Sequence, residues 1–516
     1  MKVIFISLAL VLNLFSFANI DSLLQCLDTA QYKSALYNQL AQTYADSSFE
    51  LSYQYIQKAV FEAKKESNHL ESANAYCFLG EFYYSQSQLD SALFYTQRSL
   101  PLYQTSEDLL GECTAYNNIA SISYNLGNID TALYFFNLAL EVERKLKNDK
   151  GIALNLNNQA IIFTYKGDYS KAYNVYNEVL SVREKIKDNI GVANTLNNIA
   201  YIFEEWGDYE KATEYYLRSL KLSESEGDKY LSSVTMNNIA YVYKQWKEYH
   251  KSLEYFEKAR KLKQEIGDKK GLANNYSSNG SVYFDMQAFE NALKYFTFSK
   301  ELYQEINHKQ GVGIAMHNIG SVYTEKQVFD KAIEYHTKAL DISKETNSKP
   351  GISKSYLYLG KDYLGKKEYK KALEYAAKSL EFAQEMNNLV SVSKVYELYR
   401  DIYIAQNDFK HALKYYKDLE VLNDSLFNAE KHRQMTMMNT VFEVEKKEAE
   451  NLLLTEKNLK NKALIEKKEL QYQQEKTTKT FTAIALVIVF IFGVFVSFLY
   501  RKNSYTSETS CKEILN

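Results

Sequence analysis

Residues 197–212 of the 516-residue chain read NNIAYIFEEWGDYEKA, and residues 237–252, forty positions later, read NNIAYVYKQWKEYHKS. The same spacing extends far beyond these two copies. A small residue of the second half recurs every forty positions, at Ala92, Ala132, Ala172, Ala212, Ser252, Ala292, Ala332, Ala372 and Ala412. A fixed period of this size indicates a repeat array, here of about ten units over residues 27–426.

Each unit contains two helical patterns. Apolar residues recur at spacings of three and four, a short turn such as Trp206-Gly207-Asp208 interrupts them, and a second pattern follows. Small residues return in the first pattern at Gly80, Ala120, Ala160, Ala200, Ala240, Gly280, Gly320 and Gly360. They let two helix backbones approach closely, while aromatic side chains fill the space between helices. Because one hairpin cannot bury both of its faces, the pattern predicts an all-α stack of hairpins, a solenoid.

These residues resemble the tetratricopeptide repeat, whose small, aromatic, Gly-Asp-Tyr and alanine positions match Ala200, Phe203, Gly207 to Tyr209 and Ala212. The forty-residue spacing with Asn-Asn-Ile-Ala looks like the longer-helix variety in kinesin light chains and bacterial Rap-type regulators. The resemblance covers about four fifths of the chain and implies a right-handed α-solenoid. The helix-ending proline of the family is missing from almost every unit, since the chain holds only Pro101 and Pro350.

The first residues carry an export signal. Met1 and Lys2 precede an apolar run that ends in Ser16-Phe17-Ala18, and a charged start, a hydrophobic stretch and a small-x-small ending are typical of a secretory signal peptide. We predict a signal peptide over residues 1–18, cleaved after Ala18. The alternative is an uncleaved N-terminal anchor.

The last part of the chain predicts a stalk and a membrane helix. Residues 481–500 are twenty residues without a charge, long enough to cross the hydrocarbon core. With an exported N-terminus, the repeats would lie on the periplasmic side of a bacterial cytoplasmic (inner) membrane, and residues 501–516 would form a short cytoplasmic tail.

Residues 427–479 form a charged stalk with an imperfect heptad seam. The stalk is either a solvated spacer helix or a parallel coiled coil that makes a homodimer. The seam consists of Met435, Met438, Phe442, Ala449, Leu452, Leu459, Ala463 and Leu470, interrupted by Glu445, Glu456 and Glu466.

Composition and motifs argue against several function classes. The 62 basic and 64 acidic residues leave a net charge of -2, so no basic face predicts nucleic-acid binding. The sequence has no phosphate-binding glycine loop, no His-Glu-x-x-His helix and no Gly-x-Ser-x-Gly turn. We therefore expect no catalytic site, metal or cofactor, and read the scattered histidines His308, His317 and His336 as packing or surface residues. The cysteines Cys26, Cys77 and Cys113 are read as small buried thiols, with an exported disulfide as the alternative.

Paired asparagines are the feature that packing does not explain. One column of the first helix holds Asn117, Asn157, Asn197 and Asn237, and the next column holds Asn118, Asn158, Asn198 and Asn238. Asparagine is a mediocre helix residue. Its amide carries donors and an acceptor, so a ladder of amides can grip an extended peptide by its backbone. The alternative, for either column, is a structural bond to the neighbouring hairpin.

The family resemblance implies a location for such a peptide. In tetratricopeptide repeats the first helices line a concave groove, and in longer-helix members the asparagine of this motif contacts the bound peptide. The resemblance implicates Asn117, Asn157, Asn197 and Asn237, with Asn194, Asn274, Tyr201 and Tyr241 as groove neighbours. Because the column changes to Ser277, His317, Leu357 and Glu397 afterwards, we expect the ligand along repeats 3 to 6.

The order of parts also resembles the sensory half of bacterial membrane receptors. We therefore expect a non-enzymatic, membrane-anchored periplasmic protein that binds a protein or peptide and acts as a sensor or scaffold in signal transduction. Two alternatives remain open. One is the input half of a sensor histidine kinase or helix-turn-helix regulator that lacks its output domain, and the other is a structural scaffold for envelope assembly.

Overall fold

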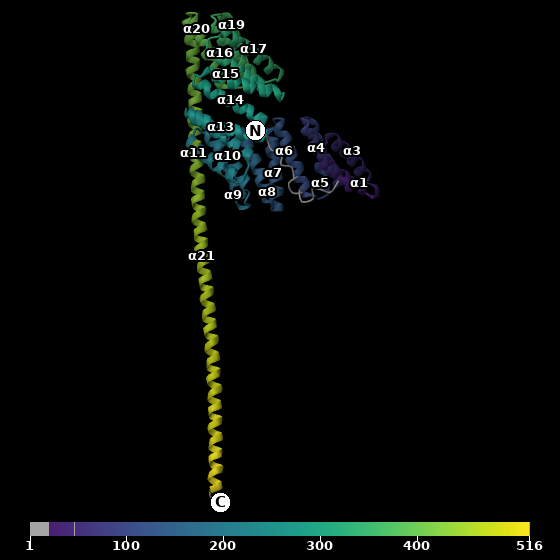
Figure 1. Cartoon of the computed structure of the whole chain (residues 1–516), viewed down its shortest axis with the longest axis vertical. Coiled ribbons are helices and arrows are strands. Elements are labelled where there is room, and N and C mark those ends of the chain that lie inside the picture. The colour runs from purple at the N-terminus through teal and green to yellow at the C-terminus, as the bar shows by residue number, and fades with distance from the viewer. Residues whose placement is uncertain (1–19, 46, 515–516) are drawn as a thin grey trace. The chain divides into compact units, whose positions relative to one another are not determined.

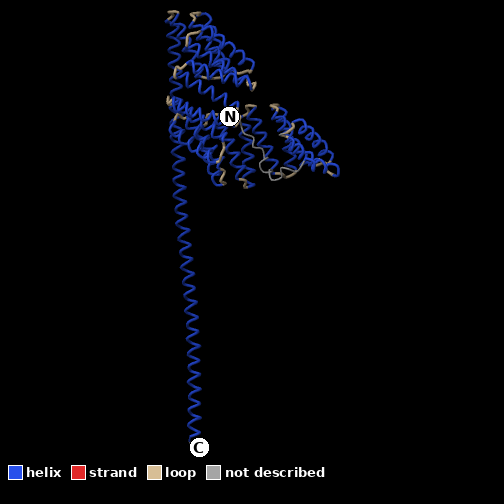
Figure 2. Tube along the Cα trace, in the orientation of Figure 1, coloured by secondary structure: helices blue, strands red, loops and turns tan. Residues whose placement is uncertain are grey.

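The computed structural model describes residues 20–45 and 47–514, and the regular secondary structure in this part of the chain is helical throughout (Figure 1). Figure 2 shows the helices joined by short loops. The helices are α1 (Ile20–Thr29), α2 (Ser34–Tyr44), α3 (Phe49–Lys65), α4 (His69–Ser85), α5 (Leu89–Thr105), α6 (Leu109–Asn125), α7 (Ile129–Leu146), α8 (Asp149–Tyr165), α9 (Tyr169–Lys185), α10 (Asn189–Glu205), α11 (Tyr209–Ser225), α12 (Lys229–Gln245), α13 (Tyr249–Glu265), α14 (Lys269–Asp285), α15 (Phe289–Glu305), α16 (Lys309–Glu325), α17 (Phe329–Glu345), α18 (Lys349–Gly365), α19 (Tyr369–Glu385), α20 (Leu389–Ala405) and α21 (Phe409–Ile514).

Consecutive helices pair as hairpins, the first made of α2 and α3 and the tenth of α20 and the start of α21. Each even-numbered helix packs against the next odd-numbered one, and that helix packs against the following hairpin. Even-numbered helices also touch one another, for example α4 with α6, α10 with α12 and α16 with α18. The first helices of the hairpins therefore form one continuous layer. The prediction of an all-α solenoid of helical repeats is confirmed.

The links between helices repeat with a period of twenty residues. From α3 onward a helix begins every twenty residues, and all helices from α3 to α20 have 17 residues except α7, which has 18. One residue of each link adopts the left-handed backbone conformation: Gly207 has φ +80°, and Lys247, at the same place one repeat later, has φ +61°. The following residue can cap the next helix, since Asp208 accepts a hydrogen bond from the backbone N–H of Lys211 (3.0 Å). Glu248 makes no such bond.

The small-residue column makes room for a large side chain sixteen positions later. A Cβ on Gly280 would lie 2.6 Å from Cδ1 of Phe296, and one on Gly320 would lie 2.6 Å from Cδ2 of His336. Real Cβ contacts are longer, so a Cβ at Gly280 or Gly320 would force these side chains to shift. The column holds only the small residues Gly and Ala in the units from Gly80 to Gly360. The large partners, such as Tyr216, are completely buried and form the core between helices.

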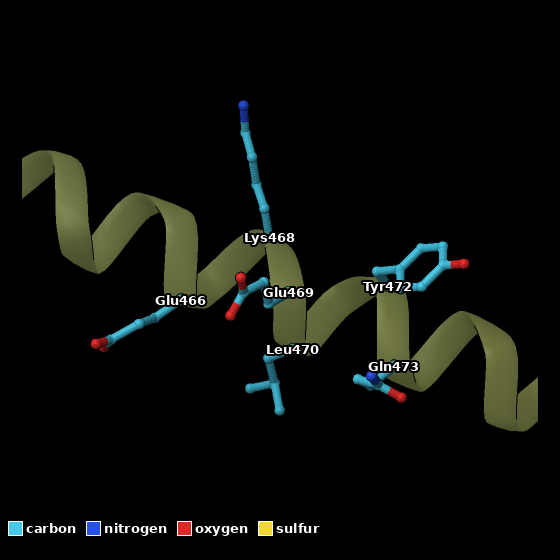
Figure 3. Close-up of a pocket in the computed structure, with 6 residues that line it drawn as sticks. All are labelled: Glu466, Lys468, Glu469, Leu470, Tyr472 and Gln473. Atoms are coloured by element: carbon cyan, nitrogen blue, oxygen red, sulfur yellow. The ribbon is translucent and has the colours of Figure 1, made fainter.

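The chain divides into two compact units, Met1–Met437 and Met438–Asn516. The second unit is part of α21. Figure 3 shows six side chains of this helix pointing outward from it: Glu466, Lys468, Glu469, Leu470, Tyr472 and Gln473. The apolar side chains Leu452, Leu459 and Leu470 of the predicted seam are exposed. The predicted signal peptide, residues 1–18, lies outside the described residues.

Candidate functional site

The second asparagine of the pair ties neighbouring hairpins together. Asn118 donates from Nδ2 to Oε1 of Glu81 (3.0 Å) and to Sγ of Cys77 (3.4 Å), both in the preceding repeat. Asn238 donates to Oδ1 of Asn197 (3.1 Å), again 41 residues back along the chain. Nδ2 of Asn318, at the same repeat position, donates to Oγ of Ser277 (3.3 Å), which is also 41 residues earlier. The structural interpretation of this column is confirmed at these three residues.

At Asn197 and Asn237, the first asparagine of the pair has its side-chain oxygen engaged by the next hairpin. Oδ1 of Asn197 accepts from Asn238 and also from Oγ1 of Thr235 (3.2 Å). Oδ1 of Asn237 accepts from Nδ2 of Asn275 (2.9 Å). Because these oxygens face protein donors, what the two amides can offer to a ligand is mainly N–H groups. Such groups pair with peptide carbonyls.

The other predicted groove residues are placed along the same layer of first helices. Asn117 lies on α6, and its buried Oδ1 has no hydrogen-bond partner among the described residues. Asn157 is half-buried on α8. Nδ2 of Asn194 bonds to the carbonyl of Ile190 in its own helix (3.0 Å). On the exposed side of α14, Oδ1 of Asn274 accepts from the hydroxyl of Tyr303.

Tyr201 and Tyr241 belong to a cluster of phenols and carboxylates at the end of α10 and α12. The Tyr216 hydroxyl donates to Oε2 of Glu204 (2.8 Å). Burial, opposed by this hydrogen bond and assisted by the nearby Glu205 charge, raises the pKa of Glu204 to about 7. Burial also raises the pKa of Tyr201 and of Tyr241. A ligand here would meet neutral phenols and a carboxyl that titrates near neutral pH.

A cavity of about 730 Å³ lies among the first three hairpins, and it overlaps the segment in which the sequence placed the ligand, repeats 3 to 6, only at its edge. Asn38, Glu71, Asn74, Cys77 and Glu81 supply polar groups to its wall. None of them was predicted as a site residue. One signal was present in the sequence: Asn38 stands eighty residues before Asn118, in the register of the second asparagine column.

The two cysteines inside the array are buried thiols. Cys77 and Cys113 have about 2% of their surface exposed. Burial, with Glu81 beside Cys77 and Glu143 beside Cys113, raises the pKa of both thiols, which keeps them protonated and unreactive. Both are free thiols, and this confirms the first reading for Cys77 and Cys113. Cys26 is exposed on α1, so the expectation that it is buried was wrong.

The histidines of the later repeats have structural partners. Nδ1 of His308 accepts from the backbone N–H of Gly311 at the start of α16 (2.9 Å). His336 is completely buried, and its Nδ1 lies 2.7 Å from Oδ2 of the equally buried Asp362. His317 packs against His336 and Tyr358. Burial, with Lys354 and His336 nearby, lowers the pKa of His317 well below its ordinary value. These contacts agree with the interpretation of His308, His317 and His336 as packing residues.

A comparison with protein-family models decides the family. The tetratricopeptide repeat model matches residues 111–185, 191–265, 271–345 and 311–385, more than half of the chain. The chain belongs to the tetratricopeptide repeat family. A search of curated proteins found no match.

Several solved structures of repeat proteins are similar to this tetratricopeptide repeat chain. A Rap protein complexed with competence and sporulation factor is 14% identical, with a TM-score of 0.48, covering 71% of this chain and 99% of that one. The apo form of the quorum sensor NprR from B. thuringiensis is 16% identical, with a TM-score of 0.47, covering 70% and 99%. A signal transduction ATPase with a tetratricopeptide repeat sensor, from Pyrococcus horikoshii, is 18% identical, with a TM-score of 0.46, covering 61% of this chain and 48% of that one.

Proposed function

We propose that this chain is a non-catalytic, membrane-anchored peptide-binding protein that acts as a sensor or scaffold. The supporting observation is the ladder of first-column asparagines on one continuous layer of helices. At Asn197 and Asn237 the oxygen is engaged by the next hairpin, and Nδ2 would donate to peptide carbonyls. Amide donors that recur in successive hairpins suit an extended peptide, because they would pair with its backbone carbonyls and would not depend on its side chains.

The membrane anchor in this proposal is residues 481–500. Within the described part of the chain, α21 is the one helix that is long and apolar enough to span a membrane. Its apolar side chains between Phe481 and Tyr500 are exposed. A continuous exposed apolar surface of this length is stable in hydrocarbon and unfavourable in water. We place the repeats on the periplasmic side of the inner membrane, because an exported N-terminus puts them there.

Substitution by aspartate tests the peptide groove without cutting the bonds between hairpins. Asn197→Asp and Asn237→Asp keep an acceptor oxygen for Asn238, Thr235 and Asn275 but remove the Nδ2 donors. We expect the double variant to lose capture of peptides of about twenty residues selected on the immobilised full chain from a random display library. Each lost hydrogen bond weakens binding by roughly tenfold.

The matched control is Asn177→Asp on α9, whose Nδ2 bonds only to the carbonyl of Tyr173 in its own helix. Circular dichroism and the denaturation midpoint check that the stack is intact. Capture by the double variant equal to that of the control would contradict the groove assignment.

Two other functions are compatible with the repeat array, stalk and membrane helix, and experiments can distinguish them. If the chain is the input half of a sensor kinase or regulator, disrupting Leu452 and Leu459 alters gene expression while peptide capture persists. If it is an envelope-assembly scaffold, a stoichiometric complex survives detergent extraction, and the same substitutions leave gene expression unchanged.

A further inference from the structure

The cavity among the first three hairpins has an unusual distribution of charge. Glu71, Glu81 and Asp108 line it, and no Lys, Arg or His is among its lining residues. Phe49, Phe78 and Phe82 supply an aromatic wall. A space of about 730 Å³ is in the usual range for small-ligand sites. An aromatic wall with carboxylates and no cation favours a positively charged guest with an apolar stem.

The Glu71 carboxylate occurs only at this end of the array. At the position of Glu71 the following units carry Gly111, Gly151, Gly191, Leu231, Gly271, Gly311 and Gly351. At Gly111, Gly151, Gly311 and Gly351 a Cβ would collide with the side chain eight residues earlier, such as Tyr103 beside Gly111. The residue eight positions before Glu71 is Ala63, which is small and fully buried. The cavity thus has a carboxylate at a position where the seven following units carry glycine six times and leucine once.

A buried acceptor in the cavity wall has no partner. Asn38 is 4% exposed, and its Oδ1 accepts no hydrogen bond from the described residues. Its Nδ2 donates to Oε2 (2.7 Å) and to the backbone oxygen (3.0 Å) of Glu71. An unpaired buried acceptor costs about 1–3 kcal/mol. A ligand that donates to Oδ1 would remove this cost.

The carboxylates near Asn38 are held by amides and a phenol. Oε2 of Glu71 also accepts from Nδ2 of Asn74 (3.3 Å), and Oδ1 of Asn74 accepts from the Tyr103 hydroxyl (2.9 Å). Oε1 of Glu81 accepts from Asn118 (3.0 Å). Burial raises the pKa of Glu81, and the bond from Asn118 opposes that shift. A cation beside Glu81 would favour its ionised form.

We propose that this cavity binds a basic side chain, Lys or Arg, of the peptide that the array captures. The aliphatic stem would pack on the phenylalanine wall, and the charged head would donate to Asn38 Oδ1 and to the carboxylates of Glu71 and Glu81. An ammonium has three donors and a guanidinium five, which suits three acceptors in one wall. The site deepens the proposed function and rests on it, since the peptide is the same one.

The experiment compares peptides of about twenty residues, long enough to span several hairpins, selected from a random display library on the immobilised full chain and on a Glu71→Gln/Glu81→Gln variant. Glutamine has nearly the same shape, and Glu62→Gln, whose carboxylate pairs with Lys65 on α3, serves as the control. We expect the peptides selected on the wild type and on the control to share a Lys or Arg. The double variant loses this preference, and the selected peptides bind it about tenfold or more weakly.

The outcomes separate this site from the groove. Captured peptides without a basic residue, or a basic preference that survives in Glu71→Gln/Glu81→Gln, would overturn the cavity assignment and leave the peptide function standing. If no peptide is captured by the wild type, the proposed function fails. Calorimetric titration with N-acetyl-lysine amide and its uncharged norleucine counterpart then tests the cavity alone. Binding of the lysine derivative without any captured peptide would show a site for free organic cations, which contradicts the peptide assignment.

Discussion

At the scale of single residues, the repeats use polar side chains in two opposite ways. The asparagines place amides between hairpins, where each bond specifies how one repeat sits on the next. The pair of His336 and Asp362 instead replaces an apolar contact, because the same positions one repeat earlier hold Phe296 and Val322. Oδ1 of Asp362 also accepts from Oγ1 of Thr324 (2.6 Å), so both carboxylate oxygens are paired inside the core.

Breaking this buried pair is predicted to cost more than removing it. Asp362→Val leaves His336 without its acceptor and should destabilise the array by about 3–5 kcal/mol. The double variant His336→Phe/Asp362→Val restores the residue types of the preceding repeat and should recover most of that loss. Urea denaturation followed by circular dichroism measures both variants. Equal destabilisation by the single and double changes would contradict this account.

Glu204 gives a prediction of pH dependence. Its pKa of about 7 in the folded chain exceeds its ordinary value of 4.5, so the folded state holds the proton more tightly than the unfolded state does. Its stabilising contribution is present below pH 4.5 and is lost as the pH rises through 7. We expect Glu204→Gln to remove a decline of roughly 1–3 kcal/mol between pH 5 and pH 8. The exposed Glu210→Gln on α11 should leave the decline unchanged, and a decline that persists in Glu204→Gln would refute the assignment.

At the scale of helices, the fold was readable because the small, aromatic and alanine columns keep one period. The left-handed residue of a link could be predicted from the sequence most directly where that residue is glycine. Thirteen links place a non-glycine residue in the left-handed conformation. Four of these residues are asparagine, which tolerates that conformation, but the side chains of the others, such as Lys187 and Lys247, do not predict it. The cost of such a residue is of order 1 kcal/mol, and packing of two 17-residue helices overrides it.

Copying one link into the next repeat should stabilise the array. Trp246-Lys247-Glu248 stands where the preceding repeat has Trp206-Gly207-Asp208. Lys247→Gly relieves the positive φ, and Glu248→Asp supplies the missing cap, so the double change should add about 1–2 kcal/mol. Thermal unfolding measures the gain. The reverse change at Gly207 and Asp208 should lower the midpoint, and no shift in either direction would contradict the argument.

At the scale of the whole molecule, sequence reasoning identified the first helices that carry the asparagine columns but missed the cavity. The asparagine columns can be recognised in the sequence because they repeat. The cavity is lined by residues that depart from the repeat, mainly Glu71 and Glu81. A search for residue types that recur every forty positions does not detect such departures. Only the contact between hairpins shows that Asn38, Glu71 and Glu81 line one space.

The exposed seam of α21 predicts a dimer of whole molecules. In a Cys26→Ser/Cys511→Ser background, Leu459→Cys should give a disulfide-linked dimer when the full chain in lipid vesicles is oxidised, because seam positions face each other in a parallel coiled coil. Asn461→Cys, two residues away, points from the seam and should cross-link poorly. Equal cross-linking at both positions, or none, would favour a solvated spacer helix.

The constant twenty-residue spacing of helix starts also has a consequence for how such a chain can change in length. Loss or duplication of forty residues would join an odd-numbered helix to an even-numbered one through an unchanged link, and every column would stay in register. A change of twenty residues would exchange the first and second helices of every later hairpin. The gene for such a protein can therefore grow or shrink by whole hairpins, and each step lengthens or shortens the layer of first helices.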